Sequence, residues 1–100
     1  MPGDPRFHAM LKEMGDLHDL KQEGYGSEGD PFANFHTMSR FGIHPWQYVV
    51  GRIEEKMQRL ASVMTREHSG VDEVEELRDI AVLAAIGKVL FEEEVNNGTK

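Results

Sequence analysis

One predicted helix carries a line of acidic side chains that runs directly into an apolar stripe. Residues three or four apart share a helix face, and this spacing joins Asp72, Glu75, Glu76, Asp79, Leu83, Ile86 and Leu90. Because the apolar half of that face must be buried, the acidic half lies at the mouth of the core. Carboxylates in that position are costly unless a positive charge meets them. Mg²⁺ with a phosphate is one candidate for that charge, and a neighbouring Lys or Arg is the other.

The composition describes one small domain. One hundred residues allow a single core with little to spare, so we expect one domain over residues 1–100, with its core at 6–94 and frayed ends at 1–5 and 96–100. A net charge of −7 argues against direct binding to a nucleic-acid backbone. The chain has no cysteine, which excludes disulfides and thiolate metal sites.

We expect neither a membrane span nor a secretion signal. No stretch of the sequence approaches the roughly 18 uninterrupted apolar residues that a membrane span needs. Residues 1–5 lack the basic and apolar regions of a signal peptide. The sequence therefore predicts a complete protein that works in the cytoplasm.

Apolar spacing predicts four helices and no strand. The helices are expected at residues 6–23, 32–41, 45–68 and 71–94. Asp4 is suited to cap the first helix, Pro5 suits its first turn, and Gly24 is expected to end it. The predicted fold is all-α, a small antiparallel bundle of three to four helices in which the two long helices pair with the N-terminal one.

The aromatic and apolar side chains outside the long helices predict further packing. The loop at residues 24–36 carries Phe32 and Phe35, so it is expected to lie against the helices rather than in solvent. Other apolar side chains exceed what so small a core can hold: Met10, Met14, Phe41 and Trp46. We therefore expect a homo-oligomer in which a second copy covers them.

Four charged side chains of the third predicted helix form one polar stripe: Arg52, Glu55, Lys56 and Arg59. One interpretation is a solvated face whose local ion pairs contribute about 0.2–0.5 kcal/mol each. The other is a wall for phosphate and metal. In that case Glu55 ligates Mg²⁺, while Lys56 and an arginine meet phosphate oxygens.

The acids of the last predicted helix also allow two interpretations. The helix dipole favours acids in the first turn, which explains Asp72 and Glu73. Asp79 lies more than one turn inside the helix, in line with the apolar residues, so the dipole explains it poorly. Asp79 is therefore expected either to bind a metal ion or to form a buried ion pair with a cation of the polar stripe.

The sequence does not indicate several other common sites. The five histidines show no pairing pattern and no H-E-x-x-H occurs, so zinc is not expected. The glycines around Tyr25 do not form a P-loop. His44, which precedes Pro45, is expected to belong to a turn.

A series of short motifs resembles a known family. In chain order the motifs are Lys21-x-x-x-Tyr25-Gly26, Asp30-Pro31-Phe32-Ala33-Asn34-Phe35, Pro45-Trp46, Arg52-x-x-Glu55-Lys56-x-x-Arg59-Leu60 and Asp79-Ile80-Ala81-Val82. They fall within residues 17–92. In this order they resemble the MazG-like proteins of phages and bacteria, also called nucleotide-modification-associated domain proteins. These proteins are similar to the all-α NTP pyrophosphatases.

The resemblance implies a helical, oligomeric, nucleotide-binding fold, in the host cytoplasm if a phage encodes it. In the related enzymes, acids on two helices hold Mg²⁺, and a nucleoside triphosphate is split into a monophosphate and pyrophosphate. Carried to this sequence, the resemblance makes Glu55 and Asp79 catalytic residues that hold the metal together with Glu76. Glu75 competes with Glu76 for that place. The nucleotide would be bound by Lys21, Tyr25, Asn34, Arg52, Lys56 and Arg59.

One departure from the enzymes bears on the activity. Their first motif is E-x-x-E, but Glu54 is followed by Met57 at that spacing, and Glu55 by Gln58. Fewer acids mean weaker Mg²⁺ binding. The sequence thus leaves three functions open. They are a Mg²⁺-dependent nucleotide pyrophosphohydrolase, a catalytically inactive protein that binds or sequesters host or signalling nucleotides, and a purely structural helical oligomer.

Overall fold

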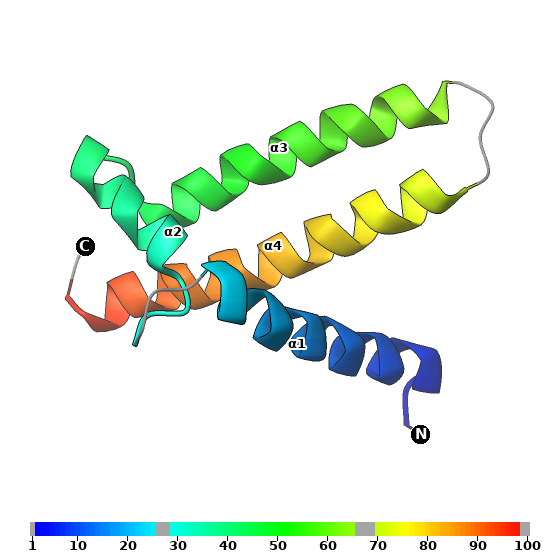
Figure 1. Ribbon diagram of the computed structural model, residues 1–100, viewed down its shortest axis with the longest axis horizontal. Coiled ribbons are helices and arrows are strands. Elements are labelled where there is room, and N and C mark those ends of the chain that lie inside the picture. The colour runs from blue at the N-terminus through cyan, green and yellow to red at the C-terminus, as the bar shows by residue number, and fades with distance from the viewer. Residues whose placement is uncertain (1, 26–28, 66–69, 99–100) are drawn as a thin grey trace. The chain divides into compact units, whose positions relative to one another are not determined.

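The computed structural model describes residues 2–25, 29–65 and 70–98, with the backbone alone for 22–25. The helical segments are α1 (Pro5–Tyr25), α2 (Ala33–His36), the short 3-10 helix η1 (Thr37–Phe41), α3 (Pro45–Met64) and α4 (Val71–Asn96) (Figure 1). These ranges contain no β-strand, which confirms the all-α prediction. The chain divides into two compact units, Met1–Asn34 and Phe35–Lys100. In the described ranges, no helix combines the length and the apolar character needed to cross a membrane.

The first unit consists of α1 and the turn that follows it. Asp4 accepts a hydrogen bond of 2.8 Å from the backbone N–H of Arg6, which confirms the predicted cap. The Arg6 guanidinium also donates to this carboxylate, and the two hydrogen bonds lower the pKa of Asp4. The helix continues through Gly24 to Tyr25, so the predicted stop at Gly24 is wrong. One glycine costs a helix only about 1 kcal/mol, which the neighbouring turns can offset.

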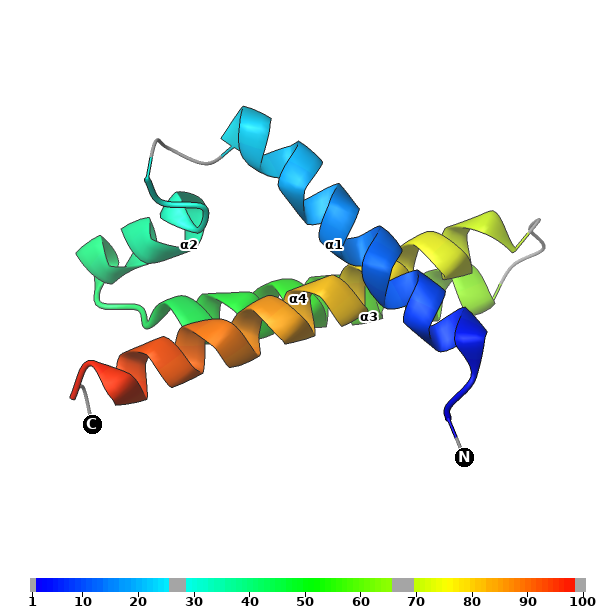
Figure 2. The same cartoon turned by 90° about the horizontal axis from the view of Figure 1, so that it is seen from below.

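The second unit is built on an antiparallel hairpin of α3 and α4, which lie side by side in both views (Figures 1 and 2). Its core is formed by Phe35, Val49, Val63, Leu83 and Leu90. Leu83 and Leu90 are the predicted apolar continuation of the acidic line, and Ile86 is half-buried beside them. Burying this stripe against α3 places the acidic end of the same face next to α3.

The helix ends follow the predicted turn chemistry with small shifts. Pro45 is the first residue of α3, as predicted, but the helix ends at Met64, and the expected continuation through residues 66–68 lies outside the described residues. α4 begins after Gly70, whose φ of 90° requires a glycine, and it extends two residues beyond the predicted end.

The predicted helix at residues 32–41 is two short segments. α2 passes directly into η1, and Gly42, with a φ of 75°, ends η1 in the left-handed conformation. Phe35 is buried and its ring lies 6.0 Å from that of Tyr48, so this part of the loop packs as predicted. The Phe32 ring lies 5.5 Å from that of His18 within the first unit.

Candidate functional site

Three charged side chains meet between α3 and α4. The Lys56 ammonium donates a hydrogen bond of 3.1 Å to Asp79 Oδ2, and it lies 3.6 Å from Glu76 Oε1. Glu76 and Asp79 are one helical turn apart on α4, so both carboxylates converge on a single cation from the facing helix. Of the two interpretations that the sequence left open for Asp79, the structure contains the ion pair.

The surroundings make these charges interact more strongly than surface charges do. The side chains of Lys56, Glu76 and Asp79 are only 15%, 14% and 24% exposed. Partial removal of water lowers the effective dielectric constant and strengthens attraction within the cluster. One ammonium faces two carboxylates, so the cluster carries a formal charge of −1. Arg78 Nη2, at 3.5 Å from Asp79 Oδ1, supplies further positive charge.

The cluster forms one wall of an open pocket of about 420 Å³. The pocket is lined by Lys56, Arg59, Ser62, Val63, Asp72, Glu75, Glu76 and Asp79. Its volume falls within the range of small-molecule sites. Two cations and four carboxylates give the lining a formal charge of −2. Such a pocket attracts a cation, or an anion that arrives with its own metal ion.

Of the other predicted site residues on α3 and α4, two line the pocket and two do not. Arg59 and Glu75 line the pocket and are exposed, so both Glu75 and Glu76 border the same space. Glu55 does not face Asp79, because neighbouring helix residues point about 100° apart and Lys56 takes that direction. The Glu55 carboxylate is 58% exposed and lies 3.8 Å from Arg52 Nε. The predicted sharing of one cation by Glu55 and Asp79 therefore has no counterpart in these contacts.

Three predicted nucleotide-binding residues belong to the first unit. Lys21 and Asn34 are exposed. The side chain of Tyr25 lies outside the described residues. The roles that the family resemblance implies for these three residues stay predictions.

The fit of a metal ion rests on the chemistry of the donors. No three His, Asp or Glu side chains in the described ranges are grouped so that they hold a metal ion by themselves. Mg²⁺ is commonly held by one or two carboxylates together with substrate phosphates. Glu76 and Asp79 supply two hard oxygen donors. Both carboxylates already converge on one cationic group, the Lys56 ammonium. The pair fits a metal ion that arrives with a ligand.

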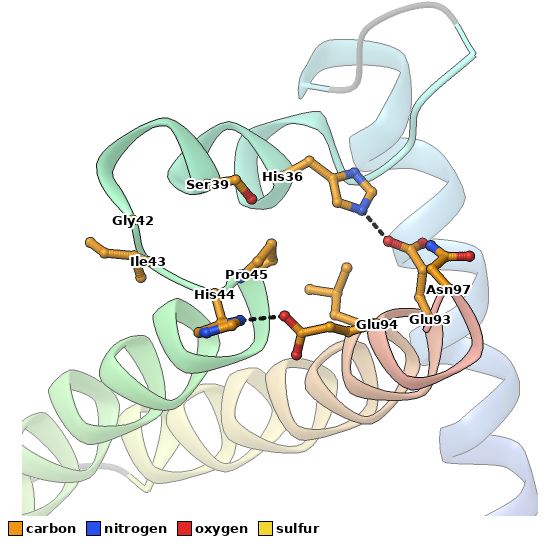
Figure 3. A pocket seen from close by; sticks show the side chains of 10 residues that line it. His36, Ser39, Gly42, Ile43, His44, Pro45, Glu93, Glu94 and Asn97 are labelled. Carbon is orange, nitrogen blue, oxygen red and sulfur yellow. Dashed lines mark hydrogen bonds and ion pairs between the residues drawn. The ribbon is translucent and has the colours of Figure 1, made fainter. Parts of the chain in front are cut away.

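A second pocket lies at the other end of the hairpin and was missed by the sequence analysis. It has a volume of about 380 Å³, and its lining includes two imidazole–carboxylate pairs (Figure 3). His36 Nε2 lies 2.6 Å from Glu93 Oε1, and His44 Nδ1 contacts Glu94. The partners are 57 and 50 residues apart, so no local spacing joins them. They tie the end of α2 and the residue that precedes α3 to the last turns of α4.

Comparison with known proteins gives no relative of this chain. No family model matches it, and neither a curated protein nor a solved structure is matched.

Proposed function

We propose that this protein binds a nucleotide as its Mg²⁺ complex in the pocket between α3 and α4. The observation that carries the proposal is the convergence of Glu76 and Asp79 on one cationic group at 3.6 and 3.1 Å. The MazG-like resemblance supplies the ligand class. It also leads us to propose a MazG-like arrangement of the helices, a homo-oligomer and a cytoplasmic location.

The charge of the pocket favours the metal complex over the bare nucleotide. A polyphosphate alone would meet four carboxylates, whereas a divalent cation reverses the sign of that interaction. Glu76 and Asp79 would hold the metal, which neutralises phosphate charge and polarises bound water when present. Lys56 would turn from the carboxylates to a phosphate oxygen, and Arg59 at the rim would meet another. In this proposal the metal ion takes the place of the Lys56 ammonium between the two carboxylates.

The geometry favours binding over hydrolysis. The E-x-x-E motif of the all-α NTP pyrophosphatases is absent from α3, and the contact of Glu55 is with Arg52 rather than with the α4 acids. Catalysis by a metal ion needs a coordination sphere that fixes the water as well as the phosphates. We therefore propose a nucleotide binder that sequesters its ligand. Formation of monophosphate and pyrophosphate from a nucleotide panel with Mg²⁺ would instead identify a pyrophosphohydrolase.

The test is thermal unfolding of the purified protein with nucleoside and deoxynucleoside triphosphates, with and without Mg²⁺. A nucleotide that binds the pocket should raise the Tm by about 5 °C or more at saturation, and only with Mg²⁺. Glu76→Gln should abolish the increase because it removes one of the two converging carboxylates. Glu92→Gln is the matched control, since Glu92 is an exposed acid of the same helix paired with Lys88 at 2.8 Å. No increase with any nucleotide would leave a helical protein whose charges only form ion pairs.

A further inference from the structure

Tyr48 and Arg52 form a contact between two flat groups on the surface of α3. The Arg52 guanidinium lies over the Tyr48 ring, 6.0 Å from the ring centroid, which is within the range of a cation–π contact. The Tyr48 ring also lies 6.0 Å from the ring of Phe35, which is buried in the core. Because one flat group is anchored on the core and the other lies over it, the pair is already ordered before any ligand binds.

This contact lies on the same side of α3 as the cations of the pocket. Residues four apart on a helix are neighbours on one face, so Tyr48 and Arg52 align with Lys56, and Arg59 falls within the same arc of about 80°. Arg52 precedes Lys56 by about 6 Å along the helix axis, and Tyr48 precedes it by about 12 Å. A ligand whose phosphates meet Lys56 and Arg59 can therefore extend along α3 and reach the Tyr48–Arg52 contact with its other end.

The pocket itself offers charged groups for phosphate and metal but no surface for a base. Its lining, as far as the structure describes it, contains no aromatic side chain. Nucleobases are commonly held by stacking on aromatic rings and on the planes of arginine guanidinium groups. A nucleotide bound by its phosphates in the pocket thus needs a stacking surface outside the lining, and the Tyr48–Arg52 contact supplies one on the same face of α3.

The orientation of Arg52 suits stacking better than phosphate binding. Its Nε lies 3.8 Å from a Glu55 carboxylate oxygen, so one donor edge of the guanidinium already faces an acid. A phosphate would compete with that carboxylate for the edge, whereas a base needs only the flat face. The Arg52 side chain is 37% exposed, and Tyr48 is half-buried.

We propose that Tyr48 and Arg52 bind the base of the nucleotide whose phosphates and Mg²⁺ occupy the pocket. This inference rests on the proposed function and names the part of the ligand that it leaves open. Stacking tolerates every base because each has a π-face, so both purine and pyrimidine nucleotides should bind. The same contact distinguishes a nucleotide from an inorganic polyphosphate, which has nothing to stack.

The experiment compares ATP, CTP and inorganic tripolyphosphate, each with Mg²⁺, by isothermal titration calorimetry. The wild-type protein should bind both nucleotides about tenfold or more tightly than tripolyphosphate. Arg52→Lys keeps the charge but removes the flat surface, so it should weaken both nucleotides about tenfold and leave tripolyphosphate unchanged. Arg40→Lys is the matched control, since Arg40 is an exposed arginine of η1. It should change none of the three affinities.

A second pair of variants separates stacking from folding. Tyr48→Phe keeps the ring and should keep the affinity for ATP, whereas Tyr48→Leu should lose it. Unchanged binding of tripolyphosphate shows that each variant is folded. Equal affinities of the wild type for ATP and tripolyphosphate would overturn the base site and leave the pocket as a site for Mg²⁺ and phosphate. An equal loss of all three ligands in Arg52→Lys would place a phosphate, not the base, at Arg52. Binding of none of them by the wild type would overturn this inference and the proposed function together.

Discussion

At the scale of single residues, Lys56 joins the two helices of the hairpin and pairs with the two carboxylates that we propose as metal ligands. Its ammonium contacts two carboxylates of α4, and all three side chains are largely withdrawn from water. Partly buried charges are costly to desolvate, so the cluster is tolerated because its members satisfy one another. A cluster that only stabilised the fold could be replaced by apolar residues at little cost. Its position on the wall of a pocket is what connects it to binding.

Asp79→Asn should lower the stability of the metal-free protein. The substitution keeps the size of the side chain but leaves Lys56 with Glu76 as its nearest carboxylate, at 3.6 Å. Because that partner remains and Asp79 is a quarter exposed, the free energy of unfolding should fall by about 1–2 kcal/mol rather than by the full cost of stranding a buried charge. Urea unfolding without Mg²⁺ measures the change.

Asp16→Asn controls for the loss of an exposed acid. Asp16 pairs with Lys12 at 2.9 Å but is 66% exposed, so its loss should change stability by less than about 0.5 kcal/mol. A metal-free Asp79→Asn more stable than wild type would mean that repulsion with Glu76 outweighs attraction to Lys56. If Asp79→Asn lost stability but bound nucleotide as well as wild type, Asp79 would be an ion-pair partner of Lys56 and not part of a nucleotide site.

At the scale of elements, α3 and α4 approach closely at one point. A Cβ added at Gly87 would lie 3.1 Å from Val49 Cγ1, and Val49 is fully buried. Gly87 therefore permits the close contact of the two helices. By contrast, Gly51 on α3 has no atom within 4 Å of an added Cβ.

The two glycines predict opposite signs for the same substitution. Gly51→Ala should raise the free energy of unfolding by about 0.5–1 kcal/mol, because alanine favours the helix and meets no obstacle. Gly87→Ala gains the same propensity but crowds Val49, and overpacking costs about 1–3 kcal/mol, so stability should fall by about 1 kcal/mol. Thermal and urea unfolding of both variants test this. If Gly87→Ala proved as stabilising as Gly51→Ala, the helices would be farther apart than the structure places them.

The sequence predicted a structural feature where neighbouring residues determine it, and missed it where distant segments come together. Helical spacing, the Asp4 cap and the Pro45 start are local, and all three were found. The site was predicted only in part, because spacing placed Glu55 and Lys56 on one polar stripe without showing which of them faces α4. That depends on which side of each helix is buried, and the buried side is marked by Val49 and Val63 on α3 and by Leu83 and Leu90 on α4. The two His–Glu pairs join distant segments and had no local signal at all.

At the scale of the whole molecule, apolar association and net charge oppose each other. In the part of the chain that the structure describes, fifteen large apolar side chains are exposed and would favour the proposed homo-oligomer, while a charge of −7 on each chain would oppose it. The sequence alone predicted an oligomer from its surplus of apolar residues. It could not show which apolar side chains stay exposed, because that depends on which side of each helix the core takes up.

This opposition predicts that salt strengthens the proposed homo-oligomer. Repulsion between two chains of −7 acts over about 30 Å at 0.01 M salt but over only about 6 Å at 0.3 M, whereas burial of apolar side chains is unaffected or slightly favoured. The dissociation constant should therefore fall several-fold across that range, and Tm should rise with protein concentration at every salt level. Sedimentation velocity in a NaCl series provides the measurement. Lys88→Ala serves as the control, because losing a cation from each copy makes the repulsion stronger and the salt effect larger. A dissociation constant that rises with salt would mean that ion pairs between the copies, rather than buried apolar side chains, hold the assembly together.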